Sequence, residues 1–207
     1  MHEKVLPGGS CNLLDRLEAL RDAKLDGWTL AGGTGLALHL GHRVSDDFDF
    51  FRTDAMDVRA LQGPLSLCGT LETLQESEHT LTVLLLDVKL SFFRIPHRFL
   101  YPAAPFRFFR VAHEKDIALM KLVAIASRGS RKDFVDLYAI LRNGPQLREL
   151  FNEITRKYGD RVDSYHILKS LTYFEDAEQE PMPVMLEPFD WEKCKAFFVR
   201  NAHAIVL

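Results

Sequence analysis

The stretch LAGGTGLALHLGHRVSDDFDFF, residues 30–51, decides the fold. Its first apolar residues end at Gly32 and Gly33, which predicts a buried strand entering a tight turn. A short helix is expected to follow over residues 35–40, capped by Thr34. Glycines let a ligand approach the backbone, and a helix N-terminus offers N–H groups and partial positive charge to an anion. Such a turn is more often structural than functional, so it does not decide the function alone.

The same stretch ends in two aspartates, Asp47 and Asp49, in a second predicted strand. Alternation along a strand places both carboxylates on one face, while Phe48 and Phe50 point into the core. Two neighbouring carboxylates repel each other unless a cation lies between them. Mg²⁺ binds through one or two carboxylates plus substrate phosphates. An exposed turn is the alternative, but the glycine turn upstream favours a functional pair.

Along the rest of the chain, strands come first and helices later. This order indicates an α+β architecture with an N-terminal mixed sheet and a C-terminal helical part. The acidic segment 175–190 contains three prolines and is predicted to be a loop. Further strands are expected within residues 70–74 and 80–93, and helices over residues 13–25, 116–126, 130–141, 146–158, 163–173 and 191–206.

Composition limits the class of protein. The chain has 207 residues, 47% of them hydrophobic and 27% charged, and a net charge of −3 at pH 7. It is too apolar for a disordered chain, lacks the run of about 18 apolar residues that a membrane helix requires, and begins without the apolar core of a signal peptide. Its three cysteines match neither a disulfide framework nor a zinc pattern. We therefore expect a soluble, cytoplasmic protein that is not a general nucleic-acid binder.

A second candidate segment, DIALMKLVAIASRGSRKDFVDL, spans residues 116–137. Lys121 is the one charge within a long apolar stretch of a predicted helix. Such a lysine either extends to water or pairs with an anion. Arg128 lies two turns further along the same face.

Two acids follow in the next predicted helix. Asp133 and Asp136 are three residues apart and therefore share a face. Ser130 followed by Asp133 also resembles a helix capping box, which would explain one of the two acids without a function. Both interpretations stay open at this point.

Residues 94–110, RIPHRFLYPAAPFRFFR, combine four arginines with five aromatic residues and no acid. This is the composition of a groove for single-stranded nucleic acid, through phosphate pairing and base stacking. The structural alternative, somewhat favoured, is a loop whose aromatic side chains cover the core beneath exposed arginines.

Both candidate segments resemble the AbiEii/AbiGii-type nucleotidyltransferases, a branch of the DNA polymerase β-like superfamily known mainly as toxins of bacterial toxin–antitoxin systems. GGTGLALHLGHRVSDDFDFF is similar to the family's glycine turn followed by Arg-x-Ser-x-Asp-x-Asp. The second segment is similar to its Lys…Arg-Gly-x-x-Arg-Asp-Phe-x-Asp-Leu block. The resemblance implies a polymerase β-like nucleotidyltransferase core over residues 1–112 and a helical part over residues 113–207 that completes the active site.

The resemblance also implies roles for individual residues, with Asp47, Asp49, Lys121 and Asp133 as the catalytic set. Asp47 and Asp49 would bind Mg²⁺, which neutralises the phosphates of an NTP and activates the attacking hydroxyl. Lys121 would pair with the nucleotide phosphates, and Asp133 would be a later catalytic acid. Nucleotide binding or support of the site is implied for Gly32, Gly33, Thr34, Arg43, Ser45, Arg128 and Asp136.

One position departs from the superfamily's pattern. A third carboxylate usually stands on a strand after the aspartate pair, where it helps to deprotonate the acceptor. The strand LLLDVKLSFF, residues 84–93, offers Ser91 there, and Asp87 lies about 13 Å away along the same face. Either Asp133 takes this role, or acceptor activation is weak, or the alignment is out of register.

The function implied is Mg²⁺-dependent transfer of NMP from an NTP to an acceptor hydroxyl, on a tRNA 3′ end or on a protein, by the toxin of a bacterial toxin–antitoxin system. A cognate antitoxin protein would then be a partner. One alternative is a nucleotide-binding or protein-interaction module of the same fold with weakened catalysis. Another is a phosphotransferase that uses the same residues for attack at the γ-phosphate.

Overall fold

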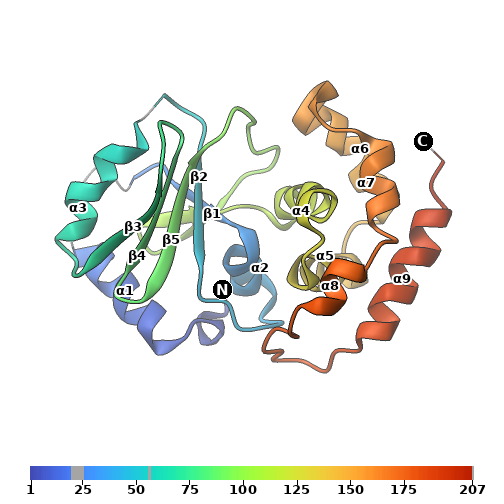
Figure 1. The fold of residues 1–207 in the computed structure, drawn as a ribbon, viewed down its shortest axis with the longest axis horizontal. Helices are drawn as coiled ribbons and strands as arrows, with labels where there is room; N and C mark the ends of the chain where they lie inside the picture. Colours follow the sequence, from blue (N-terminus) through green and yellow to red (C-terminus); the bar gives the residue numbers. More distant parts are fainter. Residues whose placement is uncertain (20–25, 56, 207) are drawn as a thin grey trace. The chain divides into compact units, whose positions relative to one another are not determined.

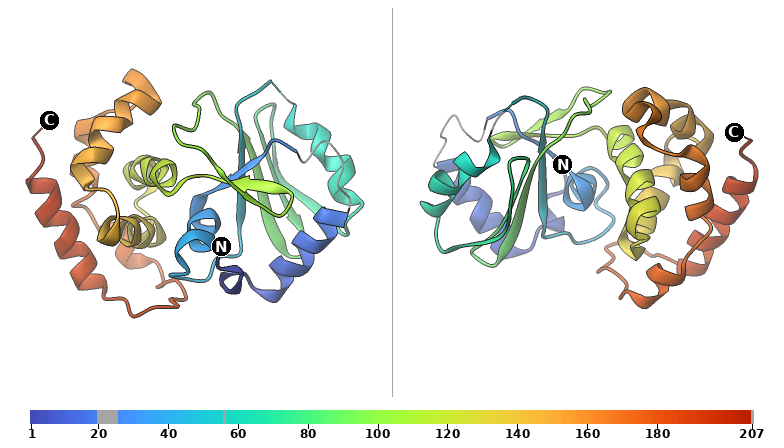
Figure 2. Two further views of the ribbon diagram at one scale, coloured as in Figure 1. Left: turned by 180° about the vertical axis from the view of Figure 1, so that it is seen from behind. Right: turned by 45° about the horizontal axis from the view of Figure 1, so that its top comes forward.

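The computed structural model describes residues 1–19, 26–55 and 57–206, which belong to two compact units, Met1–His113 and Glu114–Leu207. Unit 1 is a β-sheet with helices on both of its sides, and unit 2 is helical (Figure 1). Figure 2 shows the same elements from two further directions. The predicted α+β architecture, with strands first and helices later, is confirmed.

The strands described in unit 1 are β1 (Thr29–Ala31), β2 (Phe48–Arg52), β3 (Leu71–Glu76), β4 (Thr80–Leu85), β5 (Val88–Arg94), β6 (Ala104–Phe106) and β7 (Phe109–Val111). They form one seven-stranded sheet in the order β3-β4-β5-β2-β1-β7-β6. β2 pairs parallel with β5 and antiparallel with β1, while β1 pairs parallel with β7. The sheet is therefore mixed, as predicted.

Helices α1 (Gly8–Ala19) and α3 (Gln62–Ser66) lie on one side of this sheet, and α2 (Gly32–Leu40) lies on the other (Figures 1 and 2). Two short 3-10 helices, Glu3–Val5 and Val58–Leu61, complete the helical elements described in unit 1. The core between the sheet, α1 and α3 is aromatic and aliphatic. It includes Trp28, Phe48, Phe50 and Phe92, each at most 2% exposed. Burial of the two β2 phenylalanines leaves the alternate residues of β2 for the other face.

Several details of unit 1 differ from the predictions. Helix α1 begins at Gly8, earlier than predicted, and the part of the prediction over residues 20–25 lies outside the described residues. Residues 94–110 contain the short strand β6 and the first two residues of β7, and neither strand was predicted. β6 was missed because it contains Pro105, and proline is rare inside strands. Proline is tolerated here because β6 is an edge strand of the sheet. Asp87 stands in the β4–β5 turn, at φ +63°, and not on a strand face.

Unit 2 contains α4 (Glu114–Arg128), α5 (Arg131–Asn143), α6 (Leu147–Tyr158), α7 (Ser164–Ser170), α8 (Glu175–Gln179) and α9 (Trp191–His203), with a 3-10 turn over Gly159–Arg161. Helix α4 packs on α5, α6 and α7, and α5 also packs on α8 and α9. Phe134 of α5 is fully buried and its ring contacts Phe174, Trp191 and Phe198 at centroid distances of 5.1–6.1 Å. The helices predicted here are all present.

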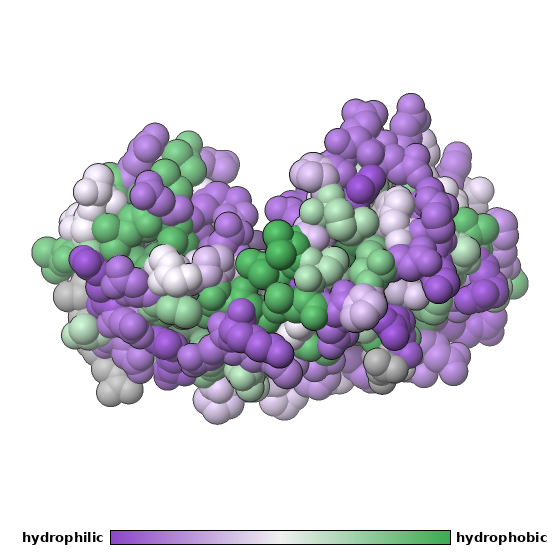
Figure 3. All heavy atoms as spheres, turned by 90° about the horizontal axis from the view of Figure 1, so that it is seen from below, coloured by the Kyte–Doolittle hydropathy of each residue, from purple (hydrophilic) through white to green (hydrophobic). Residues whose placement is uncertain are grey.

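The predicted loop over residues 175–190 was wrong at its start, where α8 forms. Arg131 Nε donates to the Ala177 carbonyl at 2.7 Å, so α8 is fixed by a contact from α5 that is distant in sequence. Hydrophilic residues cover much of the face drawn in Figure 3. Within the described residues, every helix is too short or too polar to cross a membrane.

Candidate functional site

Strand β1 ends where α2 begins, and this junction is built around Gly32. Its φ of +64° lies in the left-handed region that favours glycine. A Cβ at this position would lie 2.6 Å from Asp49 Oδ2, so the missing side chain also leaves room for the aspartate. The sheet register brings the two together, because Ala31 pairs with Asp49 across the β1–β2 ladder. The glycine turn and the second aspartate therefore belong to one site.

The next glycine is enclosed by the segment that precedes β2. A Cβ at Gly33 would overlap Arg43 Nη2 and would lie 3.3 Å from Ser45 Oγ. Thr34 Oγ1 lies 2.8 Å from the same Ser45 hydroxyl and donates to the carbonyl of Asp47. Thr34 was predicted to cap the helix, and this was wrong, because α2 begins two residues earlier and its N-cap has no side-chain bond. The threonine instead joins α2 to the chain ahead of β2.

Four polar residues meet on one face: Lys89 and Ser91 of β5, Asp49 of β2, and Asp47, which was predicted to lie in the strand but directly precedes β2. Asp49 stands directly opposite Ser91 in the parallel ladder. Two residues earlier in each segment, Lys89 Nζ lies 2.6 Å from Asp47 Oδ2. Asp47, Asp49, Lys89 and Ser91 are called the strand cluster below. The side chains of Lys89 and Asp47 are 39% and 34% exposed, so solvent and ligands can reach this pair.

The strand cluster fits a Mg²⁺ ion that is shared with a substrate. The described residues contain no group of three or more His, Cys, Asp or Glu side chains that could hold a metal by themselves. Asp47 and Asp49 supply two carboxylates on one face, and Mg²⁺ commonly takes one or two carboxylates while keeping water or substrate phosphates as further ligands. The donor set thus suits a metal that arrives with a phosphate.

In unit 2, helices α4 and α5 bring together Lys121, Arg128, Asp133 and Asp136, called the helix cluster below. Lys121 Nζ lies 2.7 Å from Asp133 Oδ1 and 2.6 Å from Asp136 Oδ2. Arg128 Nε and Nη2 donate to Asp133 Oδ2 and Oδ1 at 2.7 and 3.0 Å. Both aspartate side chains are 0% exposed, and the Lys121 side chain is 6% exposed. All four predicted residues of this segment therefore meet.

Their charges decide the ionisation of Asp133. Burial alone would raise the pKa of Asp133, but the Lys121 ammonium and the Arg128 guanidinium outweigh burial and hold this pKa below its usual value. Asp133 is consequently ionised at neutral pH, and both of its oxygens are engaged. Such a carboxylate is suited to holding cations in place and poorly suited to accepting a proton.

The capping-box interpretation of this segment was wrong. Ser130 is the N-cap of α5, yet its side chain caps no backbone N–H of the helix. Its Oγ donates to Glu180 Oε2 at 2.6 Å, and the Arg131 backbone N–H donates to the same oxygen at 2.9 Å. Glu180, which directly follows α8, therefore accepts the hydrogen bonds at the start of α5. This leaves both aspartates of the segment to the helix cluster.

Residues 94–110 are more structural than their composition suggests. Phe109 is 4% exposed and its ring lies edge-on to Phe50 at a centroid distance of 5.2 Å. Arg107 pairs with Asp15 at 2.6 Å and also with Glu3, both near the N-terminus of the chain. Two of the residues proposed for a nucleic-acid groove are thus part of the fold.

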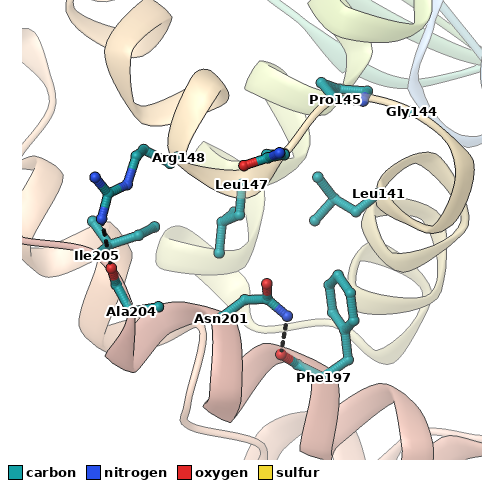
Figure 4. A pocket seen from close by; sticks show the side chains of 10 residues that line it. Leu141, Gly144, Pro145, Leu147, Arg148, Phe197, Asn201, Ala204 and Ile205 are labelled. Atoms are coloured by element: carbon teal, nitrogen blue, oxygen red, sulfur yellow. Dashed lines mark hydrogen bonds between the residues drawn. The ribbon is translucent and has the colours of Figure 1, made fainter.

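Sequence reasoning missed Lys89. The signal was present, because Lys89 and Ser91 have the same i, i+2 spacing as Asp47 and Asp49, and only the register between β2 and β5 was lacking. A cavity of about 390 Å³ in unit 2 is lined by residues outside the helix cluster. Leu141, Leu147 and Phe197 are among the side chains around it (Figure 4).

Solved structures of similar fold define the class. MenT4, a nucleotidyltransferase toxin from Mycobacterium tuberculosis H37Rv, superposes with a TM-score of 0.56 at 19% identity over 96% of this chain and 85% of its own. A putative nucleotidyltransferase from Helicobacter pylori gives 0.54 at 15% identity, over 98% of this chain and 92% of its own. The chain therefore has a nucleotidyltransferase fold.

Sequence comparison gives the family. The family model for the nucleotidyl transferase AbiEii toxin of type IV toxin–antitoxin systems matches residues 69–204, and the chain belongs to this AbiEii family of nucleotidyltransferases. The uncharacterized protein aq_aa25 of Aquifex aeolicus (strain VF5) is 38% identical over 204 residues, which are 96% of this chain and 91% of that protein. The family match includes β5 and the helix cluster, whereas the glycine turn and the aspartate pair precede it.

Proposed function

We propose that the protein transfers NMP from an NTP to an acceptor hydroxyl with the help of Mg²⁺. The hydroxyl oxygen forms a bond to the α-phosphorus, the bond to the bridging oxygen breaks, pyrophosphate leaves, and the hydroxyl proton passes to water. The packing of Asp49 against Gly32 supports this most directly. It sets a carboxylate beside the N-terminus of α2, where backbone N–H groups attract phosphate.

In this proposal, unit 1 holds the triphosphate. Gly32 and Gly33 let phosphate oxygens approach the backbone of α2, and the buried Arg43 adds positive charge. Thr34 and Ser45 fix the turn through their hydroxyl contact. Asp47 and Asp49 would hold Mg²⁺, which when bound neutralises phosphate charge and polarises the α-phosphate.

The helix cluster lies within unit 2. The Lys121 ammonium has three N–H donors, and its two bonds to buried carboxylates fix its position tightly. We propose that it pairs with phosphate oxygens of the nucleotide. Asp133, with both oxygens bonded to cations, acts by orienting Lys121 and Arg128, and Asp136 supports the same lysine.

Membership in the AbiEii toxin family supports a toxin as the biological role. The acceptor is then the 3′ end of a tRNA or a protein hydroxyl, and a cognate antitoxin protein is an expected partner. Among residues 94–110, Arg98 and Arg110 are exposed, and we propose that these arginines contact RNA phosphates.

The test is incubation with each α-³²P-labelled NTP, Mg²⁺ and total bacterial RNA, followed by a denaturing gel. We expect label on tRNA-sized RNA or on protein, reduced at least about 100-fold by Asp49→Ala, since metal stabilisation of phosphoryl transfer is worth several kcal/mol. The neighbouring Asp46 is exposed and lies outside the site, so Asp46→Ala is the matched control and should keep full transfer. Full transfer by a folded Asp49→Ala protein would refute the proposal.

One observation favours the alternative of a nucleotide-binding module with weakened catalysis. Ser91 stands in register with Asp49 at the position where a third carboxylate would assist the acceptor. A module of this kind binds NTP and releases no pyrophosphate with any acceptor. A parallel reaction with γ-³²P-labelled NTP separates the remaining alternative, because a phosphotransferase transfers the γ-label and a nucleotidyltransferase does not.

A further inference from the structure

The strand cluster contains one positively charged side chain, that of Lys89, which has no role in the proposed transfer reaction. Where three carboxylates would carry a charge of −3, the strand cluster has Asp47, Asp49 and Lys89, with Ser91 uncharged, so two negative charges and one positive charge leave −1. A divalent cation is attracted less strongly to −1 than to −3. The lysine also lies against one of the two carboxylates that would bind the metal.

We propose that Lys89 is a positioning residue that holds Asp47 in the nucleotide-free protein, so that the carboxylate pair accepts a divalent cation together with the triphosphate and poorly without it. This rests on the proposed metal role of Asp47 and Asp49. Lys89 Nζ lies 2.6 Å from Asp47 Oδ2, which is the distance of a charge-assisted hydrogen bond. A metal ion at this oxygen must compete with the ammonium.

The exposure of the pair makes an exchange of partners feasible. With 39% and 34% of their side-chain surfaces accessible, Lys89 and Asp47 form an ion pair of the weakly held, solvent-screened kind. Lysine carries a compact charge on a flexible four-carbon stem, so its ammonium can move from a carboxylate to a nearby phosphate without backbone change. A bound triphosphate would draw Lys89 away and release Asp47 for the metal.

The main-chain geometry keeps Lys89 in place for this role. β5 pairs with β2 on one side and β4 on the other, so the strand is fixed from both edges. Leu90 and Phe92, which alternate with Lys89 and Ser91, are buried in the core. A shift of one residue would turn Lys89 into that core, so the register strongly specifies its face.

The test is Mn²⁺ binding by electron paramagnetic resonance, with and without a non-hydrolysable α,β-methylene NTP. Without nucleotide, Lys89→Met should bind Mn²⁺ about three- to tenfold more tightly than the wild type, as expected for loss of one exposed competing charge. The gain in Mn²⁺ affinity on adding the analogue should be correspondingly smaller in Lys89→Met. Lys89→Arg retains the charge and should resemble the wild type.

Lys193→Met is the matched control, because Lys193 forms an exposed ion pair with Asp190 in unit 2. It should leave Mn²⁺ binding unchanged. If Lys89→Met does not fold, Lys89→Gln tests the same loss of charge. Equal Mn²⁺ affinity of the wild type and the neutral variants without nucleotide overturns the inference about Lys89. This outcome does not contradict the proposal of nucleotidyl transfer. Absence of Mn²⁺ binding in every protein, even with the analogue, overturns the metal role itself.

Discussion

Lysine meets aspartate in both units, and the surroundings differ. In the strand cluster, the Lys89–Asp47 pair is more than a third exposed on both partners. In the helix cluster, Lys121 forms ion pairs with two aspartates whose side chains are fully buried. The Coulomb attraction between such partners is strongly reduced by water and much less reduced in the protein interior. The exposed pair can therefore exchange partners, whereas the buried group depends on every member for its stability.

The largest expected effect tests the buried side of this contrast. Lys121→Met leaves Asp133 and Asp136 buried without their shared cation, and breaking a buried ion pair in this way costs about 3–5 kcal/mol. We expect the free energy of unfolding, measured with urea by far-UV circular dichroism, to fall by this amount. The double variant Lys121→Met/Asp136→Leu should recover part of the loss, since one orphaned charge is removed. A single variant as stable as the wild type would contradict the assignment of these contacts.

The contribution of the helix cluster to the free energy of unfolding should also depend on pH. Because the cations lower the folded-state pKa of Asp133 below the ordinary aspartate value of 3.8, the unfolded chain takes up the proton first. The contribution of Asp133 is fully present above about pH 4 and is lost as the pH falls through the folded-state pKa. Urea unfolding between pH 7 and pH 3 should show a steeper loss below pH 4 for the wild type than for Asp133→Asn. Equal slopes for the two proteins would remove Asp133 as the cause.

A smaller effect is expected at the glycine turn beside the exposed pair. Gly32→Ala must keep φ at +64° and place a Cβ 2.6 Å from Asp49 Oδ2. The left-handed conformation alone costs a non-glycine residue about 1–2 kcal/mol. Gly63→Ala is the control, because a Cβ there meets nothing within 4 Å and the residue is helical. The control should be neutral or stabilised in thermal unfolding, while Gly32→Ala loses both stability and transfer.

The sequence predicted what local pattern can carry. Alternation in β2 predicted the burial of Phe48 and Phe50, and helical spacing predicted that Asp133 and Asp136 share a face. Both hold in the structure, because residue period determines which side chains lie together within one element.

Contacts between elements could not be predicted from these local patterns. Lys89 was overlooked because its importance depends on the parallel register of β5 with β2, and two strands 36 residues apart leave no local trace of their pairing. The helix α8 and the bond from Ser130 to Glu180 were missed for the same reason, since tertiary contacts override local propensity. Thr34 was assigned to a cap because threonine is among the residues preferred at helix N-caps. Its observed partner, Ser45, lies eleven residues further along the chain, and local sequence does not reveal that contact.

The smallest expected effect tests the exposed side of the contrast. Lys89→Met removes a pair of which both partners are accessible to water, and such pairs contribute about 0–1 kcal/mol. The free energy of unfolding should therefore change by less than about 1 kcal/mol, against the several kcal/mol expected for the same substitution at position 121. Measured side by side in urea at neutral pH, the two variants share an identical chemical change and differ in burial. A loss at Lys89 as large as that at Lys121 would mean that the strand-cluster lysine supports the fold and does not merely hold Asp47.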